Sequence, residues 1–370
     1  MSELLPMLKK EITKSKLDAV LISSVSDIAY LTNFSHFSKY EREAFLFITQ
    51  GKNYILTDGR YSQSVKSKIT SFSLIEISSI STFEKVLKDL AKRRKIKRVG
   101  FDHHNITVAE HKKLSSCFSD LNHFSIGNLR AIKNAREIST IERACRLGDK
   151  TFDFILKKIQ RDITEEQLAF EIEFFIKKNG ADISFPPIVA FGKNSAFPHH
   201  KASDQRLKTN DIVLLDFGVR LNNYCSDMTR TVFLGRPTDE QKRMYQKVLE
   251  AQKKAIEYLK STLSQFPLPS RERVRVRGAS VDKVARDYIT SKSYPTIPHS
   301  LGHGIGLEVH ESPRLSPKSK DILKPGMVFS IEPGIYIPGF GGVRIEDVVV
   351  LEKTGLRLLT KSPTLDLGPK

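Results

Sequence analysis

The sequence predicts an α+β protein of two domains, an α/β domain over residues 1–130 and a larger domain over residues 131–370. Three observations support this division. The chain has 370 residues, which is enough for two domains of ordinary size. Apolar strand-like runs alternate with helical patterns in the first third of the chain. From about residue 183 the chain changes to strands and glycine-rich turns, interrupted by helices.

The elements of the first domain follow from its apolar runs. Strand composition marks the runs "LDAVLISS" (17–24), "AFLFITQGKNYILTD" (44–58) and "KRVGFD" (97–102). Helical patterns lie at the start of the chain and at "TFEKVLKDLAKR" (82–93). Strands that alternate with helices are typical of an α/β domain.

The second domain begins with a connector, "AIKNAR" at 131–136, and a long helical pattern over 137–159. A second helix is predicted over 164–180, with Thr164 as its N-cap and Gly180 just beyond its end. Further helices are expected at 238–260 and at about 280–293. Between these two helices, Pro267, Pro269 and the alternating "RVRVR" indicate an exposed inserted loop at about 264–278, with a short edge strand as the alternative.

Charge and composition exclude several classes of protein. The net charge is +18, and the densest basic run is "AKRRKIKR" at 91–98. Because no nucleic-acid motif accompanies this run, we expect a solvated face and no nucleic-acid partner.

No apolar run reaches the roughly 20 residues that cross a bilayer, and the first residues lack a signal-peptide core, so we expect a cytoplasmic protein without a membrane partner. The three cysteines are scattered and indicate neither disulfides nor a cysteine metal site.

Two hairpin-like segments carry acids at matching places. The first, at 212–232, holds Asp216 and Asp227 on either side of a polar turn, and the second, at 328–351, holds Glu332 and Glu346. A single acid of this kind is usually a turn or capping residue. Four acids in apolar strands, however, are expensive to bury unless cations lie between them. Two divalent cations would balance the four negative charges.

The stretch "SLGHGIGLEVHESP" at 300–313 supplies histidines among closely spaced glycines, which permit close approach of other groups. With His303 added to the four acids, the donor set is mostly oxygen with one imidazole. Such a donor set is typical of a site for Mn, Co, Fe or Zn, and it is less typical of a closed structural zinc site.

These segments resemble the pita-bread metallopeptidases, in the branch of aminopeptidase P and prolidase. The similarity extends upstream through "DIAYLTNFS" (27–35), "LTDGRY" (56–61) and "KNAREISTIERAC" (133–145), and leaves out only 264–278. It implies a creatinase-like N-terminal α/β domain followed by a C-terminal pita-bread catalytic domain. It also implies that a two-metal centre is held by five ligands: Asp216, Asp227, His303, Glu332 and Glu346.

The resemblance also implies roles for other side chains. Glu332 would accept the proton of a metal-bridging water, and His310 would contact the substrate carbonyl or the oxyanion. In "FPHHKAS" the family pattern of proline followed by histidine assigns the role at the scissile amide to His199, and we expect His200 to be solvated. His299 would line the proline pocket, and Arg344 would bind substrate or orient the carboxylates. Tyr336 is expected to be a wall of the site.

We therefore expect a dimetal Xaa-Pro aminopeptidase that uses a metal-bridging hydroxide, with Xaa-Pro dipeptidase (prolidase) as the alternative. The expected cofactors are two manganese ions per chain, with Co, Fe or Zn as alternatives. The expected partners are proline-containing peptides and a second copy of the chain in a homodimer. A third hypothesis is a non-catalytic binding protein on the same fold, but such proteins lose metal ligands, and all five positions are filled here.

Overall fold

A computed structural model of the chain describes residues 4–38, 40–264 and 276–365. The chain divides into two compact units, 1–128 and 129–370. Most of the predicted inserted loop at 264–278 lies outside the described residues, so its conformation stays a prediction. None of the helices in the described ranges is long and apolar enough to cross a membrane.

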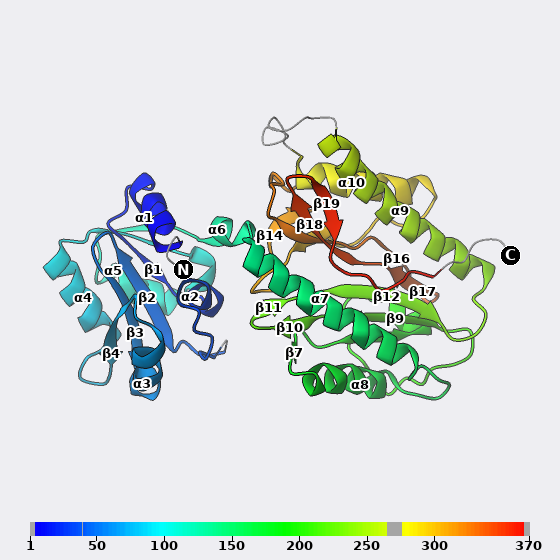
Figure 1. Cartoon of the computed structure of the whole chain (residues 1–370), viewed down its shortest axis with the longest axis horizontal. Helices are drawn as coiled ribbons and strands as arrows, with labels where there is room; N and C mark the ends of the chain where they lie inside the picture. Colours follow the sequence, from blue (N-terminus) through cyan, green and yellow to red (C-terminus); the bar gives the residue numbers. More distant parts are fainter. Residues whose placement is uncertain (1–3, 39, 265–275, 366–370) are drawn as a thin grey trace. The chain divides into compact units, whose positions relative to one another are not determined.

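The N-terminal unit is a six-stranded mixed sheet with helices around it (Figure 1). The strand order is β4-β3-β2-β1-β5-β6, and β1 runs parallel to β5 but antiparallel to β2. Its strands are β1 (Ala19–Ile22), β2 (Ala44–Thr49), β3 (Asn53–Asp58), β4 (Ser73–Ile77), β5 (Arg98–Phe101) and β6 (Asp120–His123). Its helices are α1 (Leu4–Lys14), α2 (Val25–Thr32), α3 (Gly59–Lys68), α4 (Phe83–Arg94), the 3₁₀ turn η1 (His103–Asn105) and α5 (Val108–Ser115), and α6 (Gly127–Ala131) spans the division. The alternating α/β pattern read from the sequence is therefore present.

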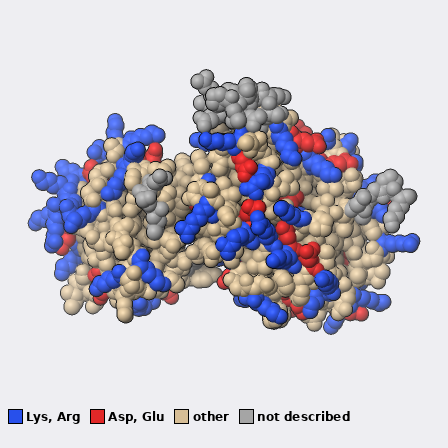
Figure 2. All heavy atoms as spheres, viewed as in Figure 1, with Lys and Arg blue, Asp and Glu red and all other residues tan. Residues whose placement is uncertain are grey.

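The basic run at 91–98 forms the end of α4 and the start of β5. Residues 92–95 and 97–98 are exposed, and Figure 2 shows Lys and Arg side chains gathered on this part of the N-terminal unit. Three of them occupy the last turn of α4, where positive charge interacts favourably with the helix dipole.

The C-terminal unit places strands between two pairs of helices (Figure 1). The helices are α7 (Ala135–Leu156), α8 (Glu165–Lys178), α9 (Asp239–Ser264) and α10 (Gly278–Ser291). The strands before α9 are β7 (Asp182–Ile183), β8 (Ile188–Phe191), β9 (Ile212–Phe217), β10 (Val219–Leu221), β11 (Tyr224–Cys225) and β12 (Met228–Phe233), with the 3₁₀ turn η2 (Gly192–Ala196) after β8. The strands after α10 are β13 (Gly302–Gly304), β14 (Glu311–Leu315), β15 (Val328–Ile331), β16 (Gly334–Ile337), β17 (Gly341–Arg344), β18 (Asp347–Glu352) and β19 (Gly355–Leu358).

The two halves of this unit repeat one arrangement. In the first half, apolar residues of α7 and α8 pack against β8, β9 and β12. In the second half, those of α9 and α10 pack against β15, β17 and β18. A backbone hydrogen bond from Glu346 N–H to Thr229 C=O, 3.1 Å long, joins the strands of the two halves. The helix pairs therefore form the outside of the unit, and the acid-bearing strands meet inside it.

The helix ends follow the predicted signals. Thr164 caps α8, its hydroxyl accepting from the Gln167 N–H, and Gly180 follows the helix with a φ of +77°. The glycines of the 300–313 stretch do not end a helix. They are needed there because the backbone packs closely against other backbone atoms. A Cβ on Gly302 would lie 2.0 Å from the Ser330 carbonyl oxygen, and a Cβ on Gly304 would lie 2.1 Å from that of Ser312.

We predict that Gly302→Ala destabilises the protein by about 2 kcal/mol or more, because the added methyl forces β13 and β15 apart. The measurement is urea denaturation of the metal-free protein. Gly148→Ala is the matched control, since this glycine lies inside α7 with its nearest neighbour at an ordinary 3.8 Å. We expect that control to stabilise the protein by roughly 0.5–1 kcal/mol. Equal effects of the two substitutions would contradict the packing argument.

Candidate metal centre and cleft

The four predicted acids lie where two strand pairs open into side hairpins. Asp216 is in β9 opposite Thr229 of β12, and Asp227 immediately precedes β12. Glu332 immediately follows β15, and Glu346 precedes β18, which pairs with β15. The short hairpins β10–β11 and β16–β17 fill the intervals. Because both halves share this design, both acid pairs point to one place in the interior.

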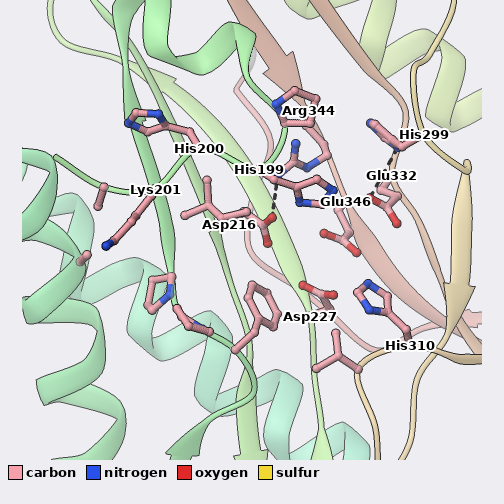
Figure 3. A pocket seen from close by; sticks show the side chains of 18 of the residues that line it. His199, His200, Lys201, Asp216, Asp227, His299, His310, Glu332, Arg344 and Glu346 are labelled. Atoms are coloured by element: carbon pink, nitrogen blue, oxygen red, sulfur yellow. Dashed lines mark hydrogen bonds and ion pairs between the residues drawn. The ribbon is translucent and has the colours of Figure 1, made fainter. Parts of the chain in front are cut away.

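Figure 3 shows Asp216, Asp227, Glu332 and Glu346 around the centre of the pocket. His303, in β13, joins them. Its Nε2 lies 3.2 Å from Glu332 Oε1 and 3.7 Å from Asp227 Oδ2. Its Nδ1 donates to the Gly304 carbonyl oxygen at 3.2 Å, which leaves Nε2 directed at the acids. This ring orientation is the one that a metal-ligating histidine adopts when its other nitrogen is held by a carbonyl group.

Three of these acids have buried oxygens without a hydrogen-bond partner. They are Asp216 Oδ1, Asp227 Oδ1 and Glu346 Oε1, and few other buried side-chain polar atoms in the described part of the chain share this condition. Ligand atoms of Asp227, His303 and Glu346 all lie within 4.8 Å of one another. Since a buried carboxylate oxygen without a partner is expensive, the donor set fits a divalent cation at this point.

The pKa values of the carboxyl groups also favour a divalent cation in the cluster. Burial, together with the neighbouring carboxylates, raises the pKa of Asp227 and that of Glu346 well above their ordinary values. Burial also opposes ionisation of Glu332, but the hydrogen bond and charge of His303 outweigh it and bring the pKa of Glu332 to about 2. His303 thus pairs with Glu332 and Arg344 pairs with Asp216, so two cationic side chains face four carboxyl groups.

Arg344 lies behind the cluster and is fully engaged there. Its Nη2 contacts Asp216 Oδ2 at 2.6 Å, its Nη1 donates to Tyr336 Oη at 2.7 Å, and its Nε donates to Thr229 Oγ1 at 3.0 Å. Of the two roles expected for Arg344, this geometry favours orienting a carboxylate. Tyr336 also reaches His299 Nε2 at 2.8 Å, so this tyrosine, expected as a mere wall, connects the arginine with the histidine.

His299 is held through both of its ring nitrogens. Its Nδ1 contacts the Ser300 carbonyl oxygen at 2.8 Å, and its Nε2 faces the Tyr336 hydroxyl. Burial and the charge of Arg344 lower the pKa of His299, although Glu332 acts in the opposite direction. The ring lines the cavity, as expected of a residue at the substrate pocket.

The acids open into a cavity of about 720 Å³, which His199, His200, His299 and His310 also line. The ring of His310 lies 4.3 Å from that of His303, centroid to centroid. Desolvation, followed by the charges of His303 and Arg314, lowers the pKa of His310 to about 4, so this imidazole is neutral at pH 7. The next residue, Glu311, accepts from Lys133 Nζ at 2.6 Å, which anchors the chain beside His310.

The expectation for His200 was wrong. His199 is exposed at the cavity, but His200 turns toward the buried Glu165, with 2.7 Å between His200 Nε2 and Glu165 Oε2. Only 15% of the His200 side chain is exposed. The two rings differ because the chain turns at 197–200, so that the His200 ring leaves the turn toward Glu165, whereas the His199 ring is exposed. Figure 3 shows the two rings apart from each other.

Sequence reasoning also missed Glu165 and Arg314. Glu165 follows a helix N-cap, and an acid in that position usually needs no further explanation. Arg314 lines the cavity four residues beyond His310, and that spacing was the only available signal. The partners of Glu165 lie 26 to 38 residues away in the sequence, so the local pattern does not indicate them.

Two family models and several known proteins match this chain. The model of metallopeptidase family M24 matches residues 139–353, and that of the creatinase/prolidase N-terminal domain matches residues 5–138. The Xaa-Pro dipeptidase of Pyrococcus horikoshii is 34% identical over 362 residues, which cover 94% of each chain.

Two solved structures are similar over nearly the whole chain. An Xaa-Pro dipeptidase from Bacillus anthracis has a TM-score of 0.87 at 33% identity and covers 98% of both chains. An X-Pro aminopeptidase from Thermotoga maritima has a TM-score of 0.81 at 34% identity and covers 95% of this chain and 97% of its own. The expected fold, a creatinase-like domain followed by a pita-bread domain, is confirmed.

We predict that Asp227→Asn has opposite effects on stability with and without metal. In the chelated protein the substitution removes a carboxyl group whose ionisation is opposed by burial and by its neighbours, so the melting temperature should rise by a few degrees. With added Mn²⁺ the melting temperature should fall below that of the wild type, and activity should be lost. Calorimetry with chelator and with Mn²⁺ measures both effects. Asp153→Asn, on the exposed face of α7, is the control and should change neither. Full activity of wild type after exhaustive chelation would contradict the metal centre.

Proposed function

This chain belongs to metallopeptidase family M24, and from that premise we propose that it is an Xaa-Pro dipeptidase with two divalent metal ions. The observation that carries the proposal is the buried cluster of four carboxylates and one imidazole, whose unpartnered oxygens open into a cavity lined by histidines and cations. Peptide hydrolysis at such a cluster needs no covalent intermediate.

The comparisons favour the dipeptidase, which the sequence had left as the alternative, over the aminopeptidase that we expected. The similar proteins from Pyrococcus horikoshii and Bacillus anthracis are named as dipeptidases. The similar protein from Thermotoga maritima is named as an aminopeptidase, which keeps that activity as the second candidate. The two differ in whether the chain may continue beyond proline.

The metal ligands that we propose are Asp216, Asp227, His303, Glu332 and Glu346. Two divalent cations held there would lower the pKa of a water molecule and stabilise negative charge that develops on the carbonyl oxygen. Manganese as the native metal, a homodimer and a cytoplasmic location are further parts of the proposal.

The protein's own side chains would divide the remaining tasks. Glu332 accepts the proton of the attacking water. His310, neutral at pH 7, directs its ring N–H at the carbonyl oxygen of the scissile bond. His199, exposed at the cavity, serves the leaving nitrogen of proline, which is a tertiary amide nitrogen before cleavage and needs a proton to leave.

A dipeptidase must also bind the free carboxylate of the substrate proline, and we assign this role to Arg314. Arg344 is occupied by Asp216 and Tyr336, so it has little capacity left for substrate. Arg314 is exposed at the cavity, and within the described residues its side chain forms no ion pair. It lies near enough to His310 to lower the pKa of that ring, so a carboxylate bound by Arg314 would lie close to the scissile bond.

The peptide substrates Ala-Pro, Ala-Pro amide and Ala-Pro-Ala test this proposal with Mn²⁺ present. We expect kcat/KM for Ala-Pro to exceed that for Ala-Pro-Ala at least about tenfold, because only the dipeptide pairs its carboxylate with Arg314. Arg314→Gln should lower kcat/KM for Ala-Pro by about 10- to 100-fold and leave the amide nearly unchanged. Lys201→Gln, at another basic residue of the cavity, is the control. Efficient removal of alanine from the tripeptide would instead make the protein an aminopeptidase.

We further predict that His199→Ala and His310→Ala each lower kcat by about 100-fold, the usual scale of a lost proton donor or acceptor. Metal content should stay at the wild-type level, because neither ring belongs to the ligand set. Steady-state kinetics and metal analysis of the same preparations measure the two quantities. His104→Ala, on the exposed surface of the N-terminal unit, should change neither. Loss of metal in either cleft variant would show that the ring is a ligand.

A further inference from the structure

We propose that Glu165 is a positioning residue for the cleft: its buried carboxylate holds both ends of the segment 191–203 and thereby sets the position of His199. The inference deepens the proposed function, because it concerns the same cleft and rests on the role given to His199. Nothing in the ligand set or in the acid-base roles above involves Glu165.

Glu165 is the first residue of α8 and is fully buried. Its carboxylate accepts from five donors. Oε1 accepts from the Phe191 N–H at 2.8 Å and from Asn194 Nδ2 at 2.9 Å. Oε2 contacts His200 Nε2 at 2.7 Å, and accepts from the Ser203 N–H at 3.0 Å and the Ser203 hydroxyl at 2.6 Å.

The donors to Glu165 lie at both ends of one segment of the chain. Phe191 ends β8 and Ser203 lies twelve residues later, so one carboxylate fixes the entry and the exit of a single segment. Between these two points the chain forms η2 and then passes along the cavity at Pro198, His199, His200 and Lys201. His199 itself is exposed and has no hydrogen bond from its ring among the described residues. Its position therefore depends on the anchoring of the backbone around it.

A carboxylate in this place is expensive. Its burial removes a full charge from water, and in the described residues no lysine or arginine pairs with it. Five hydrogen bonds offset that penalty only if every donor stays in place. An amide side chain would be less expensive to bury, but it has a single acceptor oxygen and would turn N–H groups toward the donors of Ser203 and His200.

The opposite wall of the cleft is built in the same way. Asp282 of α10, also fully buried, accepts from the Leu301 N–H at 3.1 Å and from Arg286. Arg286 in turn donates to the His299 carbonyl oxygen at 2.9 Å. A buried carboxylate near the start of a helix thus holds the segment of His299, as Glu165 holds that of His199.

Asp149 offers a matched control for Glu165. It accepts from the N–H groups of Lys361 and Ser362 and from the Ser362 hydroxyl, so it too anchors a backbone segment through several donors. Neither Asp149 nor residues 361–362 line the cavity. A substitution of Asp149 therefore removes the same kind of anchor without touching the cleft.

The experiment compares Glu165→Gln with Asp149→Asn in the full-length metal-loaded protein. Hydrogen exchange followed by mass spectrometry should show faster exchange over 191–203 in Glu165→Gln and over 361–362 in Asp149→Asn. With Ala-Pro as substrate, Glu165→Gln should lower kcat about tenfold or more and change KM little, because a misplacement near 1 Å is enough for such a loss. Asp149→Asn should keep kcat within about twofold, and both proteins should keep their metal.

A double-mutant comparison adds a second measurement. Because His200 acts through the same carboxylate, the losses in kcat from Glu165→Gln and His200→Ala should not add. The double variant of Glu165→Gln and Asp149→Asn should instead keep the kcat of Glu165→Gln within about twofold. If Glu165→Gln does not fold, Ser203→Ala and His200→Ala each remove one donor and should each lower kcat severalfold with faster exchange over 191–203.

Wild-type kcat in Glu165→Gln, unchanged exchange over 191–203, or a loss of kcat that follows loss of metal would overturn the inference. So would wild-type kcat in both single-donor variants. Failure of the proposed function has a different signature, since the wild-type protein would then cleave no Xaa-Pro substrate. The exchange measurement would still decide whether Glu165 anchors the segment.

Discussion

The burial of four carboxylates in one place is the constraint on which the rest of the C-terminal unit depends. Asp216, Asp227 and Glu346 each leave a buried oxygen without a partner, and burial raises the pKa of Asp227 and of Glu346 far above the ordinary range. A chain without a cation would not keep such an arrangement for stability alone, because each uncompensated charge is costly. The buried carboxylates of this fold therefore favour the binding of divalent metal ions.

The architecture brings these acids together by repetition. Each half of the unit supplies a strand pair that opens into a short side hairpin, and the acids lie at the opening. Glycines let neighbouring strands approach closely, as at Gly302 of β13 against the Ser330 carbonyl group of β15. The outer helices enclose the strands, so the cluster is shielded from water, and its interactions are stronger than they would be at the surface.

Around the acids, hydrogen bonds orient the side chains, and burial lowers the pKa of two histidines. Arg344 holds Asp216 and Tyr336, and Tyr336 in turn faces His299, whose pKa is lowered. His310 is also neutral at pH 7. A neutral histidine adds no positive charge to compete with metal. His310 can still donate its one N–H to a peptide, whereas the N–H of His299 is taken by the Ser300 carbonyl oxygen. Glu165 and Asp282 lie farther out and hold the backbone that carries the cleft histidines. The site is thus organised in layers, from ligands to ring-orienting groups to backbone anchors.

The amino-acid sequence was enough to predict the two-domain α+β organisation, the helix ends at Thr164 and Gly180, and the five residues that the structure gathers in one cluster. It could do so because apolar periodicity, caps and paired acids in matching hairpins are local patterns. Only the tertiary structure decided that His200 faces Glu165, that Arg344 is committed to Asp216, and that Arg314 is exposed at the cavity. Each of these facts depends on a partner distant in sequence or on the direction in which a side chain leaves an irregular segment. Hydrogen bonding and desolvation act between neighbours in space, and those neighbours exist only once the chain has folded.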